Sequence, residues 1–255
     1  MSQAEVVVIV GGTGAMGQVI TRRLAQAGKQ VVAVARTAQA LQGLVEAVPG
    51  VRPCVADIAQ DSAIEAIARQ VQALDAPVRM VIQGAGVATA GGVTTAPTSA
   101  VVDAVNIKVG GMLRLVRATA GLLVRGSRLV AIGGHYGFEP SAYACTAGVA
   151  NAALANLVRQ LSWAYGERGV TAHLVAPGPA DTDRLRRVAT DRGARDGLSP
   201  EAVLDQMRAE SAIGAFTTPE QIAWAMQMLL APEADALAGA RCSWTRAGAR
   251  DCPEP

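Results

Sequence analysis

Residues 6–17 read VVVIVGGTGAMG, and they set the architecture of the chain. Five consecutive β-branched residues predict a buried strand, and the glycines after them allow a sharp turn. From residue 15 the apolar side chains take the spacing of a helix that ends at Gly28. The N-terminus of such a helix offers unpaired N–H groups and a positive dipole end, so this strand–turn–helix unit predicts a dinucleotide pyrophosphate site. A tight turn without a ligand is the alternative.

Strand-like and helix-like segments alternate along the rest of the chain. The predicted strands are 6–10, 30–35, 51–55, 78–82, 127–132, 170–175 and 241–245. The predicted helices are 15–27, 38–47, 62–74, 98–123, 143–168 and 219–230. Because the strands are nearly all apolar, we expect an α/β fold with a single doubly wound parallel sheet, Rossmann-like, and helices on both faces.

The chain of 255 residues shows no internal repeat and no low-complexity linker, which favours one domain over 1–255. The segment at about 181–215 differs from the rest. Its first part, to about residue 200, is rich in Arg, Asp and Gly, and it follows a strand end, where open α/β sheets bind ligands. We interpret this segment as a substrate lid. A solvated surface insertion is the alternative.

Composition excludes several classes of protein. Hydrophobic residues make up 51% and charged residues 17%, which is typical of a globular chain. The net charge is +2 with no long basic block, so no nucleic-acid partner is expected. The start of the chain lacks the basic region of a secretory signal, and no apolar run approaches the ~20 residues that span a membrane. The cysteines at 54, 145, 242 and 252 form no metal-ligand pattern, and reduced thiols in a cytoplasmic protein are expected.

The end of the second predicted strand bears on the choice of cofactor. An acidic residue there would hold a ribose 2′-hydroxyl, whereas an arginine accommodates a 2′-phosphate. The chain has Arg36 and no acid at this point. This favours NADP(H) over NAD(H), although an ordinary surface cation is the alternative interpretation of Arg36.

The residues resemble those of the short-chain dehydrogenase/reductase family along nearly the whole chain. Residues 10–17, VGGTGAMG, correspond to its TGxxxGxG loop, but the GxxG spacing is closer to the extended and atypical branches of the family. Asp57-Ile58 resembles a pair whose acid contacts adenine, and residues 83–86, QGAG, stand where the family has Asn-Asn-Ala-Gly. Pro177-Gly178 and Thr182 are similar to a motif beside the nicotinamide. The resemblance thus implies cofactor contacts from Gly11, Thr13, Gly14, Met16, Gly17, Arg36, Asp57, Ile58, Gly84, Ala85, Gly86, Pro177, Gly178 and Thr182.

The resemblance also implies a catalytic set. Tyr143 corresponds to the family's proton-donating tyrosine, and Asn106 falls where a helix of the family carries its catalytic asparagine. The lysine expected four residues after the tyrosine is replaced by Ala147, and Gly133-Gly134 stand where a pair of serines is usual. On a helix, residues 143 and 147 would share one face, so a lysine at 147 would lower the tyrosine's pKa. Without it we expect Tyr143 to stay protonated, which favours carbonyl reduction over alcohol oxidation.

Nearby residues are candidates to substitute for the missing groups. His135 follows the glycine pair directly and is a candidate acid or base, although capping a loop is the alternative. Ser141 is a weaker candidate, with a turn hydrogen bond as its alternative. Tyr136 and Phe138 either line a substrate pocket or simply pack. His173 lies within an apolar strand and is interpreted as a core residue.

These observations predict an atypical NADP(H)-dependent oxidoreductase that reduces a carbonyl in a small or medium-sized metabolite. A non-redox isomerase, dehydratase or cyclase on the same scaffold is the first alternative, and a non-catalytic nucleotide-binding partner protein is the second. Relatives in the family assemble through their long helices, so a homodimer or homotetramer is expected. No metal and no membrane partner are expected.

Overall fold

A computed structural model describes residues 4–88, 91–239 and the backbone of 241–244. The predictions that fall on residues 1–3 and on Thr245, and on the side chains of Cys242 and Cys252, lie outside the described residues. The strands form one seven-stranded sheet in the order β3-β2-β1-β4-β5-β6-β7, and every neighbouring pair is parallel. Their bounds are β1 Val6–Val10, β2 Gln30–Ala35, β3 Arg52–Val55, β4 Val78–Gln83, β5 Leu123–Ile132, β6 Thr171–Pro177 and β7 Arg241–Trp244.

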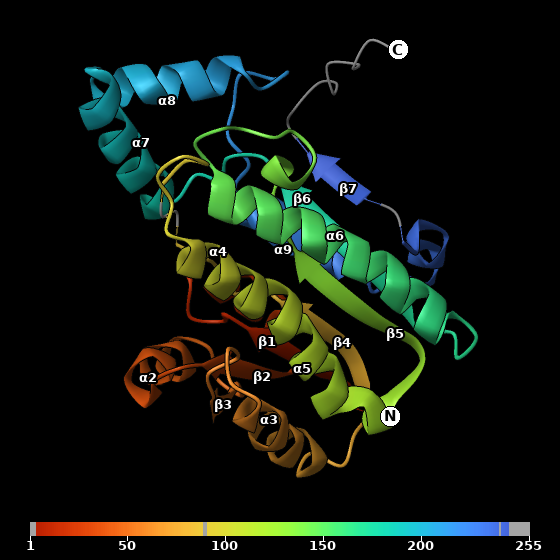
Figure 1. Cartoon of the computed structure of the whole chain (residues 1–255). Helices are drawn as coiled ribbons and strands as arrows, with labels where there is room; N and C mark the ends of the chain where they lie inside the picture. Colours follow the sequence, from red (N-terminus) through yellow and green to blue (C-terminus); the bar gives the residue numbers. More distant parts are fainter. Residues whose placement is uncertain (1–3, 89–90, 240, 245–255) are drawn as a thin grey trace.

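Helices cover both faces of this sheet, as the alternating sequence pattern predicts (Figure 1). The α-helices are α1 Ala15–Gln26, α2 Ala38–Ala47, α3 Ser62–Gln72, α4 Thr98–Val105, α5 Gly111–Thr119, α6 Cys145–Gly166, α7 Asp183–Asp196, α8 Pro200–Ala209 and α9 Pro219–Met228. A π-helical segment, η1 Asn106–Gly110, joins α4 to α5. Shorter 3₁₀ segments are η2 Ala120–Leu122, η3 His135–Gly137 and η4 Pro232–Leu237.

The first strand shows why the sheet needs cover on both sides. Val6, Val8 and Val10 belong to a core cluster that α3, α5 and α6 complete. Val7 and Ile9 belong to a second cluster, completed by α1, α2 and α9. Successive side chains of a strand point to opposite faces, so a wholly apolar strand buries apolar surface on both sides of the sheet.

The predicted elements differ from the structure in three places. The helix expected over 98–123 is interrupted by the π-helical segment, and β5 begins at Leu123 rather than at 127. The helix expected to start at Tyr143 begins at Cys145, and Tyr143 lies in the turn before it. The segment after β6 contains two helices that sequence patterning did not predict, α7 and α8, which pack against each other through Leu185, Ala189, Val203 and Met207.

Candidate active site

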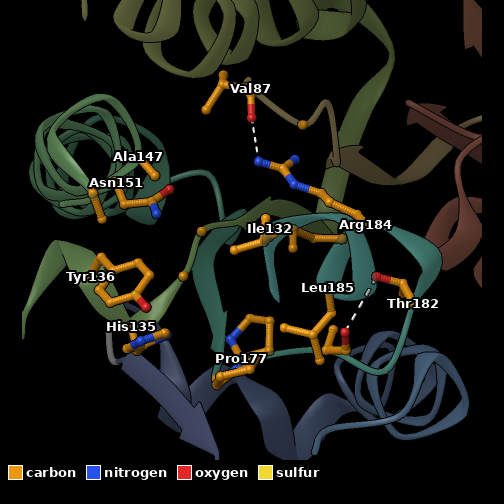
Figure 2. A pocket seen from close by; sticks show the side chains of 18 of the residues that line it. Val87, Ile132, His135, Tyr136, Ala147, Asn151, Pro177, Thr182, Arg184 and Leu185 are labelled. Atoms are coloured by element: carbon orange, nitrogen blue, oxygen red, sulfur yellow. Dashed lines mark hydrogen bonds between the residues drawn. The ribbon is translucent and has the colours of Figure 1, made fainter. Parts of the chain in front are cut away.

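A cavity of about 210 Å³ lies at the carboxyl ends of the central strands. Its walls come from the segments that follow β1, β4, β5 and β6, from the start of α6, and from α7 and α8 (Figure 2). Carboxyl ends of parallel strands are where open α/β sheets bind ligands. The lining residues include Met16, Gly84, Gly86, Lys108, Gly133, Gly134, His135, Tyr136, Tyr143, Ala147, Asn151, Pro177, Gly178, Thr182, Arg184 and Met207.

The glycine loop has the geometry that a bound pyrophosphate needs. Gly11 has a φ of +81°, and a Cβ on Gly17 would lie 2.1 Å from the Gly11 carbonyl oxygen, so the helix can approach the loop only with glycine at both positions. The α1 helix begins after Gly14, and no side chain caps its first N–H groups. An anion would satisfy those groups. The residues of the loop therefore fit a dinucleotide.

The other residues expected to hold the cofactor occupy the same edge of the sheet. Arg36 is exposed directly after β2. Asp57 is exposed after β3 and accepts a hydrogen bond from the Ala59 N–H, and Ile58 beside it is buried. Pro177 is the last residue of β6, and Gly178 and Thr182 follow it in the cavity wall.

The residues after β4 show a local difference from the expected Asn-Asn-Ala-Gly sequence. Gln83 is fully buried, donates to the Ile107 carbonyl oxygen and accepts from the Ala85 N–H. Gln83 thus ties the Gly84-Ala85-Gly86 turn to the π-helical segment. Gly84 and Gly86 line the cavity, whereas Ala85 does not.

Tyr143 lines the cavity from the turn before α6, and Ala147 lines it from the first turn of the helix. The Tyr143 ring meets the Tyr136 ring edge to face, with centroids 5.5 Å apart. The guanidinium carbons of Arg192 and Arg195 lie 5.3 and 6.0 Å from the centroid of the Tyr143 ring. The expected geometry of 143 and 147 on one helical face is wrong, because Tyr143 precedes the helix. Helix α7 instead brings cations to the tyrosine.

Asn151 occupies the space beside Gly134 and was missed in the sequence. It lies one turn after Ala147 on α6 and is only 6% exposed. A Cβ on Gly134 would lie 3.0 Å from the Asn151 Nδ2 atom, so a side chain at 134 would compete with this amide. The Asn151 Oδ1 atom is buried without a hydrogen-bond partner among the described residues. A buried acceptor at a cavity wall is available to a donor from a ligand or from water.

His135 and Tyr136 reach the same cavity from η3, after β5. His135 is 6% exposed, and its ring centroid lies 3.8 Å from that of Tyr136. Both residues therefore stand where a substrate could contact them. Phe138 packs instead against the core cluster on the α6 side of the sheet, and Ser141 does not line the cavity.

Asn106 is not brought into the cavity. Its side-chain amide donates to the Ala59 carbonyl oxygen at 3.0 Å, and its Oδ1 atom accepts from Arg114 at 2.9 Å. Arg114 also bonds the Ile58 carbonyl oxygen and Asp61. Both polar groups of Asn106 thus connect the helix to the segment after β3. This geometry fits a structural partner rather than a group that contacts substrate.

Lys108, two residues further along, lines the cavity and was also missed in the sequence. It is 6% exposed, and its ammonium donates to the Ile132 carbonyl oxygen at 2.7 Å. Burial, and then the charge of Arg184, lower the pKa of Lys108 to about 8. The sequence could have indicated that Lys108 is buried, because this lysine falls at helical spacing on the apolar stripe formed by Ala104, Met112 and Leu115.

Arg184 crosses the cavity from α7 to the loop after β4. Its guanidinium donates to the Val87 carbonyl oxygen, as Figure 2 shows. A Cβ on Gly86 would lie 2.8 Å from the same guanidinium, so glycine there leaves room for it. Leu185 and Met207 add apolar surface from α7 and α8. Helices α7 and α8 thus supply both a cation and apolar cover.

The remaining candidates lie away from this cavity. His173 is fully buried, contacts the Thr171 hydroxyl, and has its pKa lowered to about 4 by burial and by Arg128, as expected of a neutral core residue. Within the described part of the chain, Cys54 and Cys145 are free thiols, and no group of His, Cys, Asp and Glu could hold a metal ion. No helix among the described residues has the length and apolarity needed to cross a membrane.

Comparison with known proteins identifies the family of the chain. The family profile described as enoyl-(acyl carrier protein) reductase matches residues 12–244. A putative ketoacyl reductase of Streptomyces coelicolor is 25% identical over 244 residues, which cover 92% of this chain and 93% of that protein.

Two solved structures share the fold. A short-chain dehydrogenase/reductase from Serratia marcescens superposes with a TM-score of 0.82 and 25% identity, covering 94% of this chain and 96% of the other. A variant of actinorhodin polyketide ketoreductase, solved with NADPH, superposes with a TM-score of 0.84 and 23% identity, covering 94% and 95%. The chain therefore belongs to the short-chain dehydrogenase/reductase family, and its relatives are oxidoreductases.

Proposed function

We propose that this chain is an NADP(H)-dependent reductase of a small or medium-sized carbonyl compound with an atypical set of catalytic groups. The observation that carries the proposal is the position of Tyr143 in a cavity whose walls also include Met16, Gly84 and Pro177, next to the glycine loop. In this proposal a proton donor and a dinucleotide site share one cavity. Arg36 after β2 favours the 2′-phosphate of NADP(H).

The chain's own residues have separate tasks in this proposal. A bound nicotinamide supplies the hydride. Tyr143 donates a proton to the carbonyl oxygen, and Arg192 and Arg195 lie over its ring. Asn151 and His135 line the wall where a serine hydroxyl would project in other members of the family. Helices α7 and α8 exclude water as a substrate lid.

The test is NADPH consumption by the Tyr143→Phe variant. Removing the hydroxyl should lower kcat by at least about 100-fold, the lower end of what general acid catalysis contributes. Tyr165→Phe is the matched control, because Tyr165 packs at the far end of α6 against Arg168 and does not line the cavity. Equal rates for both variants would remove Tyr143 from the mechanism.

A non-redox reaction is the second candidate, and Ala147 and Gly134 favour it. Neither residue has a polar side chain that could polarise a carbonyl or hold a ribose, although both residues line the cavity. An isomerase, dehydratase or cyclase would form product with no net change in NADPH absorbance. A non-catalytic partner protein would keep its cellular effect when Tyr143 or His135 is substituted.

We also propose assembly into a homodimer or homotetramer through α4 and α6. These helices lie side by side on one face of the sheet (Figure 1). Their outer surface exposes Val102, Val149 and Trp163, the last to 87%. Trp163→Glu should therefore shift the mass measured by light scattering to that of a smaller species. An unchanged mass would place the contact elsewhere.

A further inference from the structure

The cavity holds a buried positive charge that its own walls do not neutralise. The Lys108 ammonium bonds one neutral group, the Ile132 carbonyl oxygen. No aspartate or glutamate occurs among the described residues that line the cavity. Arg184 adds a second positive charge, close enough to influence Lys108. Buried charges in proteins are normally paired, so this arrangement suits an anionic ligand.

A polar acceptor in the same cavity also lacks a partner. The Asn151 Oδ1 atom is buried without a hydrogen bond among the described residues, and Figure 2 shows the side chain directed from α6 toward Ile132. Ile132 is the residue whose carbonyl oxygen binds Lys108. A ligand that carries both a negative charge and a hydroxyl would satisfy the lysine and the asparagine together.

We propose that the substrate is a keto acid whose carboxylate binds Lys108, and that Asn151 accepts a hydrogen bond from the hydroxyl of the hydroxy-acid product. This inference rests on the proposed reductase function and names its substrate class. In the reaction the carbonyl carbon receives the hydride that bound NADPH supplies, while the carbonyl π electrons pass to the oxygen. That oxygen takes the proton of Tyr143, which solvent restores.

A phosphate of the dinucleotide is the other source of negative charge. The unpaired N–H groups of α1 and the glycine loop follow β1, whereas Lys108 bonds the last residue of β5. Strand β4 separates β1 from β5, which places these two points roughly 10 Å apart along the sheet edge. The pyrophosphate site and the lysine are therefore distinct positions, and the carboxylate of a substrate is the better partner for Lys108.

The experiment is a calorimetric titration of the full-length protein, with and without NADP⁺, using oxamate and its neutral methyl ester. Oxamate carries a carboxylate beside a carbonyl that is not reduced, so binding is measured without turnover. Lys108→Met should weaken oxamate binding at least tenfold and leave ester binding unchanged. Arg187→Met is the matched control, because it removes an exposed cation of α7 that does not line the cavity. Lys108→Gln repeats the test with a polar side chain should the methionine variant fold poorly.

Three outcomes would overturn the inference. Oxamate could bind Lys108→Met as tightly as the wild type, Arg187→Met could lose as much affinity, or Lys108→Met could instead lose affinity for NADP⁺. The last result would assign the lysine to the cofactor.

Reductase assays with pyruvate and methyl pyruvate separate this inference from the proposed function. Reduction of the ester with no preference for the acid would keep the reductase and refute the carboxylate site. Lysine-dependent oxamate binding without NADPH consumption on any keto compound would support the carboxylate site and refute the reductase.

Discussion

Raising the pH from 7 to 9.5 should stabilise the wild-type protein relative to Lys108→Met. Burial and the charge of Arg184 lower the pKa of Lys108 in the folded chain from 10.5 to about 8. In the unfolded chain the lysine regains its ordinary pKa, so between these two values the unfolded state binds more protons than the folded state. The free energy of unfolding therefore rises with pH in this window. Below pH 8 both states are charged, and this contribution is flat.

The two pKa values also give the size of the effect. At pH 7 the lysine is protonated in both states, whereas at pH 9.5 it is largely neutral in the folded state and protonated in the unfolded state. The difference in free energy of unfolding that this creates is about 2 kcal/mol. The full difference between the two pKa values corresponds to about 3 kcal/mol, which is the cost of keeping this charge buried at neutral pH.

Urea unfolding at pH 7 and pH 9.5 measures the effect. The quantity of interest is the free energy of unfolding of the wild type minus that of Lys108→Met, because other titrating groups cancel in this difference. It should rise by about 2 kcal/mol between the two pH values. Lys29→Met is the control, since Lys29 is the chain's other lysine and bonds Glu5 at the opposite end of the sheet. A difference that stays flat with pH would show that the Lys108 ammonium is hydrated, and would refute the argument from burial.

Three further predictions test the glycine loop, the core and the absence of a lysine at position 147. Gly17→Ala should lower NADPH affinity at least tenfold in a calorimetric titration, because its Cβ would meet the Gly11 carbonyl oxygen at 2.1 Å. Gly43→Ala is the control, because Gly43 faces open space on α2, and it should leave that affinity unchanged. Arg128→Met should lower the free energy of unfolding by about 1–3 kcal/mol in urea, because it leaves two carbonyl oxygens and a threonine hydroxyl without the buried guanidinium that they bond, whereas Asp235 is largely exposed. Its NADPH affinity should not change, since Arg128 lies far from the carboxyl end of β5. Ala147→Lys should raise kcat/KM for simple ketones about tenfold or more, measured by NADPH absorbance. No gain in a folded variant would mean that the cavity does not support carbonyl reduction.

Much of the fold could be predicted because its signals are local. Apolar runs such as 6–10 need cover on both faces, and their alternation with helical segments favours a parallel sheet between two layers of helices. Helices α7 and α8 could not be predicted in the same way. Helix α7 is rich in Arg and Asp and buries only Leu185, Ala189 and Gly193 of its 14 residues, so its apolar pattern is too sparse to be seen in the sequence. Helix α8 provides the apolar surface against which α7 packs.

In the candidate site too, features with a local signal could be predicted, and features that depend on contacts between distant elements could not. The glycine loop could be predicted because turn geometry, helix dipole and close packing all act within residues 11–17. Asn151 could not, because its importance comes from a contact with Gly134 on a different element. Tyr143 was predicted to lie within a helix, but the residues before Cys145 form a turn, and the cations beside its ring come from α7 rather than from position 147.

Asn106 lies outside the cavity and Lys108 lines it for a geometric reason. Residues two apart on a helix point to nearly opposite sides, so when Asn106 turns toward Ala59 and Arg114, Lys108 must turn toward β5 and the cavity. The residue type fits this position. All but two of the chain's 23 Lys and Arg residues are arginines, yet a lysine stands on the buried stripe of this helix. A compact ammonium can be buried against one carbonyl oxygen and still keep N–H groups for a ligand, whereas a guanidinium would need a wider set of acceptors. The match of Asn106 to a family motif therefore does not decide which side chain of this helix reaches the cavity; the side of the helix on which each residue lies does.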